Sequence, residues 1–502
     1  MAEAWVKLLR KAIMALTLET INETSAAALE LILAKAESSF EPWAGTTLIE
    51  RSEALELIAD RLDEASDELI KLAVAETHLA EPRLRGELKR TTFQLRLFAK
   101  QVLGGEFLDA RIDHKDDEWP MGAPRPDLRR TMQPLGPVLV FAASNFPFAF
   151  SVAGGDTASA LAAGCPVVLK VHRGHPALSR KTADVVLTAL VDAGAPGGTF
   201  DIIFGTRNGA EALADSRIKA GAFTGGIPGG RTLFDIASGR AEPIPFYGEM
   251  GSNNPVFVTP AAAEERGGSI AREFVTSFTQ SAGQLCTKPG TLFIPSESVI
   301  LDELRNMELP SEAPLLNEGI LAAFSDAKEK LEGHAGVQVL NESNSRTRGD
   351  ARPILFHTTL EQIRRDPESL LAECFGPAAL VITYEDSSEL SEVARLYEGQ
   401  LTASIHGTDS CEVGSLLQVL SHKAGRVLWN QWPTGVSVTY AQQHGGPYPA
   451  STAVQSTSVG TAAMDRFLRP LAFQGFPEHL LPTHLRESNP LGIPRQVNGE
   501  GD

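Results

Sequence analysis

The chain has 502 residues, 43% of them hydrophobic and 22% charged, which suits a globular protein of two or three domains with a large core. Its net charge of −18 argues against a general surface for nucleic acid, which needs clustered Lys and Arg. The four cysteines (Cys165, Cys286, Cys374 and Cys411) are widely scattered, which argues against a disulfide framework and against a metal site. We therefore expect a protein of a reducing compartment that binds no metal.

The first twenty residues place Lys7, Arg10 and Lys11 before an apolar stretch, as a signal peptide does. That stretch ends at Leu18, before Glu19, and no small-residue cleavage site follows. Later segments also fall short of the roughly 18 apolar residues that cross a membrane. The pattern predicts a short amphipathic helix at the N-terminus of a cytoplasmic protein without a membrane partner.

Residues 24–125 are predicted to be helical. Apolar residues between Leu55 and Leu72 recur every three or four positions, which is the period of one helix face. Thr47 and Glu50 have the spacing of a capping box immediately before this pattern. A helix should therefore begin at this point.

The pattern changes to alternating strands and helices after Gly136. Strands are predicted at 137–143, 166–171, 200–204 and 220–223, with helices at 152–163, 178–192 and 208–215 between them. This alternation indicates a parallel sheet with right-handed crossovers. Such sheets bind ligands at the C-terminal ends of their strands, where Asn145, Lys170 and the Phe223-Thr224-Gly225 turn lie.

A second α/β series follows Cys286. Its predicted strands are 291–295, 336–340, 353–356, 378–383, 402–407 and 426–430. From about residue 464, Pro470, Pro477 and Pro482 and two short apolar runs indicate an extended arm rather than a domain. The last dozen residues are expected to fray.

Cys286 lies in QSAGQLCTKPG, residues 280–290, among small, flexible and polar neighbours. A nucleophilic cysteine needs an accessible thiolate, a donor for the oxyanion and usually a base. On this peptide alone the more common interpretation is a small buried core residue. Whether Cys286 is a nucleophile or a core residue therefore depends on the other segments of the chain.

Four further segments carry candidate site residues. Asn145 follows a strand in FAASNFPFAF, Glu249 lies in YGEMGSNNP, AFTGGIPGG is a glycine-rich turn after a strand, and Glu373 with Phe375 precedes a strand in ECFGPAALV. Taken singly, each is more often an ordinary turn or loop, and a lone glycine-rich turn is a weak phosphate signal. Their joint order is far more specific.

In this order the segments resemble the NAD(P)-dependent aldehyde dehydrogenase superfamily, over residues 24–476. The positions that match motifs of the family are Asn145, Lys170, Phe223, Thr224, Gly225, Gly226, Gly230, Glu249, Cys286, Glu373 and Phe375. The resemblance identifies Cys286 as the nucleophile.

The resemblance implies an α/β fold of two Rossmann-like parallel-sheet domains and a β-ribbon oligomerisation arm. We expect a dinucleotide-binding domain at 1–250, with part of the ribbon near 105–135. A catalytic domain should follow at 251–463, and the arm and tail at 464–502. The arm would support a homodimer or homotetramer.

The resemblance also implies a mechanism. Cys286 attacks the aldehyde carbon, and the Asn145 amide and the Cys286 backbone N–H hold the oxyanion. After hydride transfer a thioester remains, and Glu249 activates water to hydrolyse it. Branches that pass the acyl group to coenzyme A generally lack this carboxylate, so a free acid is expected. Glu373 should hold the nicotinamide ribose, and Phe375 should pack nearby.

The cofactor is expected to be NADP, with NAD possible. Arg173 replaces the usual Glu that repels a 2′-phosphate, and its guanidinium suits phosphate instead. His172, His175 and Arg207 are candidates for the same pocket, although Arg173 pointing into water is the alternative. Gly226 replaces the usual Ser, which leaves backbone N–H groups to hold the pyrophosphate.

HGGPYPAS (444–451) and the stretch 456–475 resemble the bacterial α-ketoglutaric semialdehyde dehydrogenases, and NADP-dependent fatty-aldehyde dehydrogenases have similar motifs. The expected reaction is oxidation of 2,5-dioxopentanoate to 2-oxoglutarate. Medium- or long-chain aliphatic aldehydes are the alternative substrates, and a cysteine acyl hydrolase without redox chemistry is the alternative activity. Arg466 and Arg469 are candidates for binding the substrate carboxylate.

Overall fold

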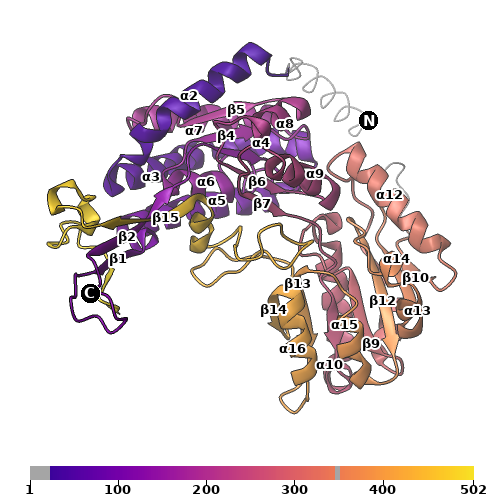
Figure 1. Cartoon of the computed structure of the whole chain (residues 1–502). Coiled ribbons are helices and arrows are strands. Elements are labelled where there is room, and N and C mark those ends of the chain that lie inside the picture. Colours follow the sequence, from indigo (N-terminus) through magenta and orange to yellow (C-terminus); the bar gives the residue numbers. More distant parts are fainter. Residues whose placement is uncertain (1–22, 345–350, 502) are drawn as a thin grey trace.

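The computed structural model describes residues 23–344 and 351–501. Figure 1 shows two α/β bodies joined along the chain, with an extended arm that projects from the first body. The helix predicted for the first twenty residues lies outside the described part of the chain.

Four helices open the described chain: α2 (Ala26–Ala44), α3 (Leu48–Glu64), α4 (Ser66–Thr77) and α5 (Glu81–Gly104). Thr47 and Glu50 form the predicted capping box at the start of α3. The prediction of helix as far as residue 125 is wrong. Helix α5 ends at Gly105, whose φ of 70° lies in the left-handed region, and η1 (Glu106–Leu108) and strand β1 (Ala110–Asp113) follow.

The first body contains a five-stranded parallel sheet with the order β5-β4-β3-β6-β7. Its strands are β3 (Val138–Phe141), β4 (Val167–Lys170), β5 (Phe200–Ile203), β6 (Ala220–Thr224) and β7 (Phe246–Glu249). The connecting helices are α6 (Gly155–Ala163), α7 (Pro176–Asp192), α8 (Thr206–Ala214) and α9 (Ile227–Ser238). Helices α2, α8 and α9 cover one face, and α3, α5, α6 and α7 cover the other.

The second body is built on a seven-stranded sheet with the order β10-β11-β12-β9-β8-β13-β14, parallel except for β10. Its strands are β8 (Val256–Val258), β9 (Thr291–Pro295), β10 (Gln338–Glu342), β11 (Ile354–Thr359), β12 (Ala378–Tyr384), β13 (Gln400–His406) and β14 (Ala424–Trp429). Helices α10 (Pro260–Thr279) and α11 (Val299–Asn306) pack on one face. The other face carries α12 (Glu318–Gly333), α13 (Leu360–Arg365), α14 (Pro367–Leu370), α15 (Leu390–Ala394) and α16 (Gly414–Lys423).

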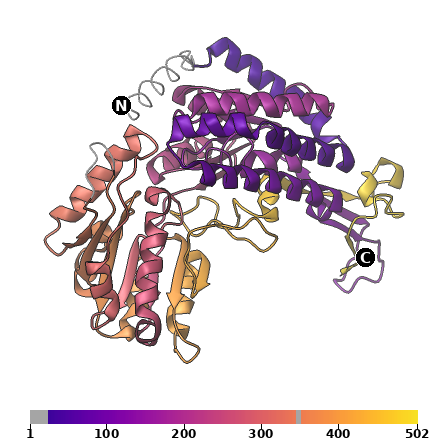
Figure 2. The ribbon, with the colours of Figure 1, turned by 180° about the vertical axis from the view of Figure 1, so that it is seen from behind.

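The arm is a third sheet with the order β15-β2-β1-β16-β17. It joins β1 and β2 (Leu128–Pro134) to the C-terminal strands β15 (Leu468–Gln474), β16 (Arg495–Val497) and β17 (Glu500–Gly501). The expected fraying of the last residues is wrong, because β16 pairs in parallel with β1 and so ties the tail to the arm. Figure 2 shows the chain end lying on the arm from the other side.

The loop from Asn430 to Gly460 crosses between the two bodies, as the yellow segment in the middle of Figure 1 shows. It is fastened to the end of β7, because Met250 N–H donates to the Ala450 carbonyl at 2.8 Å and Glu249 forms an isolated bridge with Ser451. The short helices η2 (Gln280–Gly283), η3 (Ser387–Glu389), η4 (Thr461–Phe467), η5 (Glu478–Leu480) and η6 (Thr483–Leu485) complete the fold. None of the helices in the described ranges is both long and apolar enough to cross a membrane.

Candidate active site

The segment before Cys286 is a strained turn. Ser281 and Ala282 each have φ of 53° and Gly283 has φ of 67°, so three consecutive residues adopt the left-handed region that side chains disfavour. A Cβ on Gly283 would run into the Gly376 carbonyl, so only glycine allows the two loops to meet. The turn presents Cys286 to a cavity of about 250 Å³ instead of to the core.

Glu249 ends strand β7 and is buried beside this cysteine. Its Oε1 lies 2.8 Å from His444 Nε2, and its Oε2 accepts a 2.6 Å hydrogen bond from Ser458 Oγ. Burial pushes the pKa of Glu249 up, but the neighbouring His444 and the hydrogen bonds from His444 and Ser458 outweigh burial and lower it. Glu249 is therefore held as a carboxylate at neutral pH.

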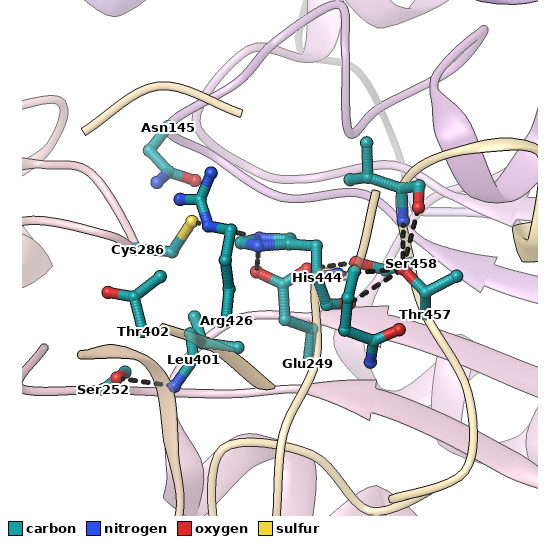
Figure 3. A network of polar contacts seen from close by, with 12 residues as sticks. Asn145, Glu249, Ser252, Cys286, Leu401, Thr402, Arg426, His444, Thr457 and Ser458 are labelled. Atoms are coloured by element: carbon teal, nitrogen blue, oxygen red, sulfur yellow. Dashed lines mark hydrogen bonds and ion pairs between the residues drawn. The ribbon is translucent and has the colours of Figure 1, made fainter. Parts of the chain in front are cut away.

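His444 connects the carboxylate to the thiol. Its Nε2 lies 3.5 Å from Cys286 Sγ as well as 2.8 Å from Glu249 Oε1, and Figure 3 shows the imidazole between the two. Burial, together with the negative charge of Glu249, raises the pKa of the Cys286 thiol well above its ordinary value. The resting thiol is therefore protonated, and a base lies in contact with it.

Asn145 follows β3 and reaches the same turn. Its side-chain Nδ2 donates to the Gln284 carbonyl at 3.1 Å, and its own carbonyl accepts a 2.6 Å hydrogen bond from Arg83. Gln284 is two residues before Cys286, so the amide is fastened beside the sulfur; Figure 3 shows it there. Asn145 is thus placed to donate to an oxygen that develops charge next to Cys286.

Asn254 supports the Cys286 segment from the other side. Its Nδ2 donates to the carbonyls of Cys286 at 2.8 Å and Lys288 at 2.9 Å. Gln400 Oε1 in turn accepts hydrogen bonds from the backbone N–H groups of Asn253 and Asn254. The stretch after Glu249 therefore ties strand β7 to the cysteine turn.

The glycine-rich turn after β6 offers an anion site. Gly226 is the N-cap of α9, and a Cβ on Gly230 would lie 2.5 Å from Met250 Sδ. Thr224 Oγ1 is buried and has no hydrogen-bond partner in the described chain. An open helix N-terminus with a free hydroxyl beside it fits the pyrophosphate of a dinucleotide.

Two basic residues lie at the end of β4 and shortly after it. Lys170 ends the strand and packs against Gly209 of α8, and burial, together with the charge of Arg173, lowers its pKa. Arg173 is exposed, and its Nη2 would lie 3.3 Å from a Cβ on Gly319 at the start of α12. Arg173 therefore faces the second body.

Glu373 and Phe375 precede β12. The Glu373 carboxylate leaves no room for a Cβ on Gly251. Since Gly251 is the second residue after Glu249, Glu373 packs against the backbone just beyond Glu249. Burial raises the pKa of Glu373 to about 7. Phe375 is partly buried next to Gly376, on which the cysteine turn packs.

Helix α5 and the segment after Asn145 form the remaining walls of the cavity. The residues that line it are Arg83, Gly86, Glu87, Arg90, Phe146, Phe150, Gln280, Ser281, Leu285, Cys286, Thr287, Gly435, Val436 and His444. The cavity is small compared with the roughly 300–1,000 Å³ of pockets for drug-sized ligands. It suits a short substrate better than a long aliphatic chain.

A model of the aldehyde dehydrogenase family matches residues 11–469. The chain belongs to this family. It is 40% identical to an α-ketoglutaric semialdehyde dehydrogenase of Acinetobacter baylyi, over 96% of this chain and 95% of that one. It is 42% identical to α-ketoglutaric semialdehyde dehydrogenase 2 of Azospirillum brasilense, over 93% and 90% of the two chains. The protein is therefore an oxidoreductase that acts on aldehydes.

Solved structures show the same fold. The NADP-dependent glyceraldehyde-3-phosphate dehydrogenase of Bacillus halodurans, complexed with NADP, superposes with a TM-score of 0.76 at 21% identity, over 90% of this chain and 91% of that one. An NAD-dependent aldehyde dehydrogenase of Sinorhizobium meliloti gives 0.75 at 21% identity, over 91% and 88%. The expected aldehyde dehydrogenase fold is confirmed.

Three residues besides Arg173 were expected at the phosphate pocket: His172, His175 and Arg207. His175 is fully buried, with its ring nitrogens 2.9 Å from Ser179 Oγ and from the Ala143 carbonyl, so it is structural. Burial lowers the pKa of His172 to about 3, which keeps it neutral. Arg207 is on α8 with its side chain 85% exposed, and its Nε lies 2.7 Å from Glu211 Oε1.

The arginines expected to bind a substrate carboxylate lie elsewhere. Arg466 is buried, 2.8 Å from Asp156, and so fixes η4 to α6. Arg469 is exposed on the edge strand β15. Neither lines the cavity.

Sequence reasoning missed four residues of the site: His444, Ser458, Arg83 and Arg90. His444 and Ser458 lie in stretches that entered the sequence analysis only through a family resemblance, because their loop has neither helix nor strand periodicity. A sequence signal was present for three other residues, Arg83, Glu87 and Arg90. Their spacing by four and three positions puts three charges on one helix face. A charged face that is partly buried in the structure is a candidate binding site.

Proposed function

We propose that the enzyme oxidises 2,5-dioxopentanoate to 2-oxoglutarate through a thioester on Cys286, with NADP as the preferred cofactor. The observation that carries the chemistry is that Cys286 Sγ, a ring nitrogen of His444 and a carboxylate oxygen of Glu249 all lie within 4.8 Å of one another, while Cys286 and His444 line the cavity. The substrate follows from the two relatives at 40–42% identity and from the small cavity.

The reaction begins with activation of the thiol. In the resting enzyme His444 Nε2–H donates to Glu249; in the other tautomer, with the proton on Nδ1, Nε2 instead takes the proton of the Cys286 thiol at 3.5 Å. Proton transfer gives a thiolate and an imidazolium that the Glu249 carboxylate stabilises at 2.8 Å. The thiolate attacks the aldehyde carbon, and Asn145 Nδ2 and the Cys286 backbone N–H donate to the alkoxide.

A bound NADP supplies the hydride acceptor, which leaves the acyl group as a thioester on Cys286. The residues that would hold it are Lys170, Arg173, Phe223, Thr224, Gly225, Gly226, Gly230, Glu373 and Phe375. Glu249 then takes a proton from water, and the hydroxide attacks the thioester carbon. The carboxylic acid leaves, and the Cys286 thiolate is reprotonated.

The preference for NADP rests on Arg173. A carboxylate at this position would repel a 2′-phosphate, whereas the guanidinium attracts it. The exposed side chain beside the start of α12 is free to pair with a phosphate at the edge of the first body. NAD remains a substrate because the other contacts do not depend on the phosphate.

We also propose that residues 1–250, 251–463 and 464–502 serve as the dinucleotide-binding domain, the catalytic domain and the oligomerisation arm. Strand β15 is the outer strand of its sheet, and alternate side chains along it are exposed. An unpaired edge of this kind invites pairing with another subunit, which supports a homodimer or homotetramer.

The test is steady-state kinetics on the full chain, followed by absorbance of the reduced cofactor. We expect kcat/KM to be highest with 2,5-dioxopentanoate and NADP. Cys286→Ala should abolish turnover but still bind NADP, as measured by calorimetry. A higher kcat/KM with dodecanal would refute the substrate, and ester hydrolysis without any hydride transfer would refute the redox activity.

A further inference from the structure

Helix α5 turns one charged face toward the cavity that contains Cys286. Arg83, Glu87 and Arg90 are spaced by four and three residues, so they share that face, and all three line the cavity. Leu285 and Val436 are among the apolar residues of the same lining. A short substrate with its aldehyde at Cys286 would extend toward this charged face.

Aromatic rings hold both guanidinium groups in place. Arg83 Cζ lies 5.0 Å from the centre of the Phe146 ring, and Arg90 Cζ lies 5.4 Å from that of Phe150. Stacked, planar guanidinium groups lose little freedom when they bind a carboxylate in two-pronged fashion. The two phenylalanines follow Asn145, so the cations are fixed relative to the oxyanion donor.

The charges on this face do not balance. Glu87 is the one carboxylate among the described residues that line the cavity, against two arginines. Its Oε1 already accepts hydrogen bonds from the backbone N–H groups of Phe148 at 2.8 Å and Ala149 at 3.0 Å. Its Oε2 lies 3.8 Å from Arg83, too far for a good hydrogen bond. Glu249 also interacts electrostatically with Arg90, but it is already paired with His444 and Ser458. The lining itself therefore carries one more positive than negative charge.

Hydrogen-bond donors are also left over. Nη1 of Arg83 and Nη1 of Arg90 are buried and have no hydrogen-bond partner in the described chain. Burial lowers the pKa of both arginines, which reflects the cost of keeping these cations out of water. An incoming anion would offset that cost.

We propose that Arg90, assisted by Arg83, is the subsite that binds the carboxylate of a short aldehyde acid. This assignment rests on the proposed function, in which Cys286 takes the aldehyde end. In an extended five-carbon substrate the carboxylate carbon lies about 5 Å from the aldehyde carbon, because four C–C bonds of about 1.5 Å separate them. The subsite therefore selects substrates whose carboxylate lies about 5 Å from the aldehyde carbon.

Arg426 is the competing cation, because its guanidinium also interacts electrostatically with Cys286. However, it does not line the cavity, and its Nη1 and Nη2 donate to the carbonyls of Gly435 and Pro433, so only its Nε has no partner in the described chain. Arg426 instead shapes the loop that carries Gly435. The α5 pair is therefore the better carboxylate site.

The test compares charged and neutral aldehydes in Arg90→Met, Arg90→Lys and Arg83→Met. We expect kcat/KM for 2,5-dioxopentanoate and for succinic semialdehyde to fall 10- to 100-fold in Arg90→Met, mainly through KM. The kcat/KM for pentanal should fall much less, because pentanal has no charge to pair and loses only the effect of Arg90 on the thiolate. Arg90→Lys should recover part of the loss. An equal loss for pentanal and the acids would overturn the assignment.

Arg85→Met is the matched control. Arg85 is on the same helix but pairs with Glu81 and Asp67 on the exposed side, so its loss should leave all substrates unaffected. Calorimetry with glutarate gives a readout without catalysis, and binding should be weakened in Arg90→Met but not in Arg85→Met. Unchanged glutarate binding in Arg90→Met would also overturn the subsite.

The subsite and the proposed substrate fail in different ways. A wild-type enzyme that prefers succinic semialdehyde to 2,5-dioxopentanoate, with the preference for charge lost in Arg90→Met, would refute the substrate and support the subsite. A wild-type enzyme that oxidises pentanal as efficiently as either acid would refute the subsite.

Discussion

Replacement of His444 tests the central claim about the active site. His444→Phe removes the group that lies between Cys286 Sγ and Glu249 Oε1 while keeping a ring of similar size. Two effects should follow, one on thiol activation and one on the charge of Glu249. They can be measured separately because they act on different steps.

The magnitude of the second effect follows from the contact that is lost. A hydrogen bond to a charged group is worth about 1.5–3 kcal/mol, and 1.36 kcal/mol corresponds to one pKa unit. Since His444 is the foremost cause that lowers the pKa of Glu249, its loss should raise that pKa. Deacylation needs the carboxylate form, so its acidic limb should move to higher pH.

The first effect should appear in the burst of reduced cofactor. Without His444 the Cys286 thiol loses its adjacent base, and general-base catalysis typically contributes about 10²–10⁴-fold. Stopped-flow absorbance at several pH values would give the burst rate, and steady-state turnover would give deacylation. A burst rate within twofold of wild type, together with an unmoved acidic limb, would refute the proposed role of His444.

Three further changes test the other parts of the structure. Glu249→Gln should keep a burst of about one reduced cofactor per active site but slow steady-state turnover at least 100-fold, because water loses its base; an unchanged steady state would exclude that role. Arg173→Glu should raise the Kd for NADP at least tenfold and leave that for NAD within about threefold, measured by fluorescence titration, whereas equal effects would remove the phosphate contact. Arg466→Met should lower the free energy of unfolding by about 3–5 kcal/mol in urea at pH 7, because Asp156 would be buried without its cation; a loss under 1 kcal/mol would contradict the pairing.

Much of the sheet architecture could be predicted from local pattern. Strands β3, β4, β5 and β6 are short apolar runs, as expected for parallel strands buried on both faces, and each lies within the predicted boundaries to within a few residues. The prediction was wrong where a strand pairs with a strand far away in the sequence. Strand β1 pairs with β16, whose register joins Ala110 to Arg495, and three-residue strands give no signal of a partner so far along the chain.

The same distinction holds for the site. The motifs around Cys286, Glu249 and Asn145 are local, so the sequence alone identified them. His444 could not be found in this way, because its role depends on a contact with Glu249, which is 195 positions earlier in the chain. Only the folded loop brings the two residues together. Arg466 was wrongly chosen because basic composition says nothing of a partner such as Asp156, which is buried on another helix.

The arginine pair on α5 affects reactivity as well as binding. A carboxylate substrate brings negative charge into a cavity where Glu249 already raises the pKa of the Cys286 thiol. The charge of Arg90 opposes that effect and also favours the thiolate and the alkoxide. A neutral aldehyde would instead leave the guanidinium groups desolvated and unpaired, which disfavours its binding. Selection for charged aldehydes therefore acts from both directions, by pairing the right substrate and by penalising the wrong one.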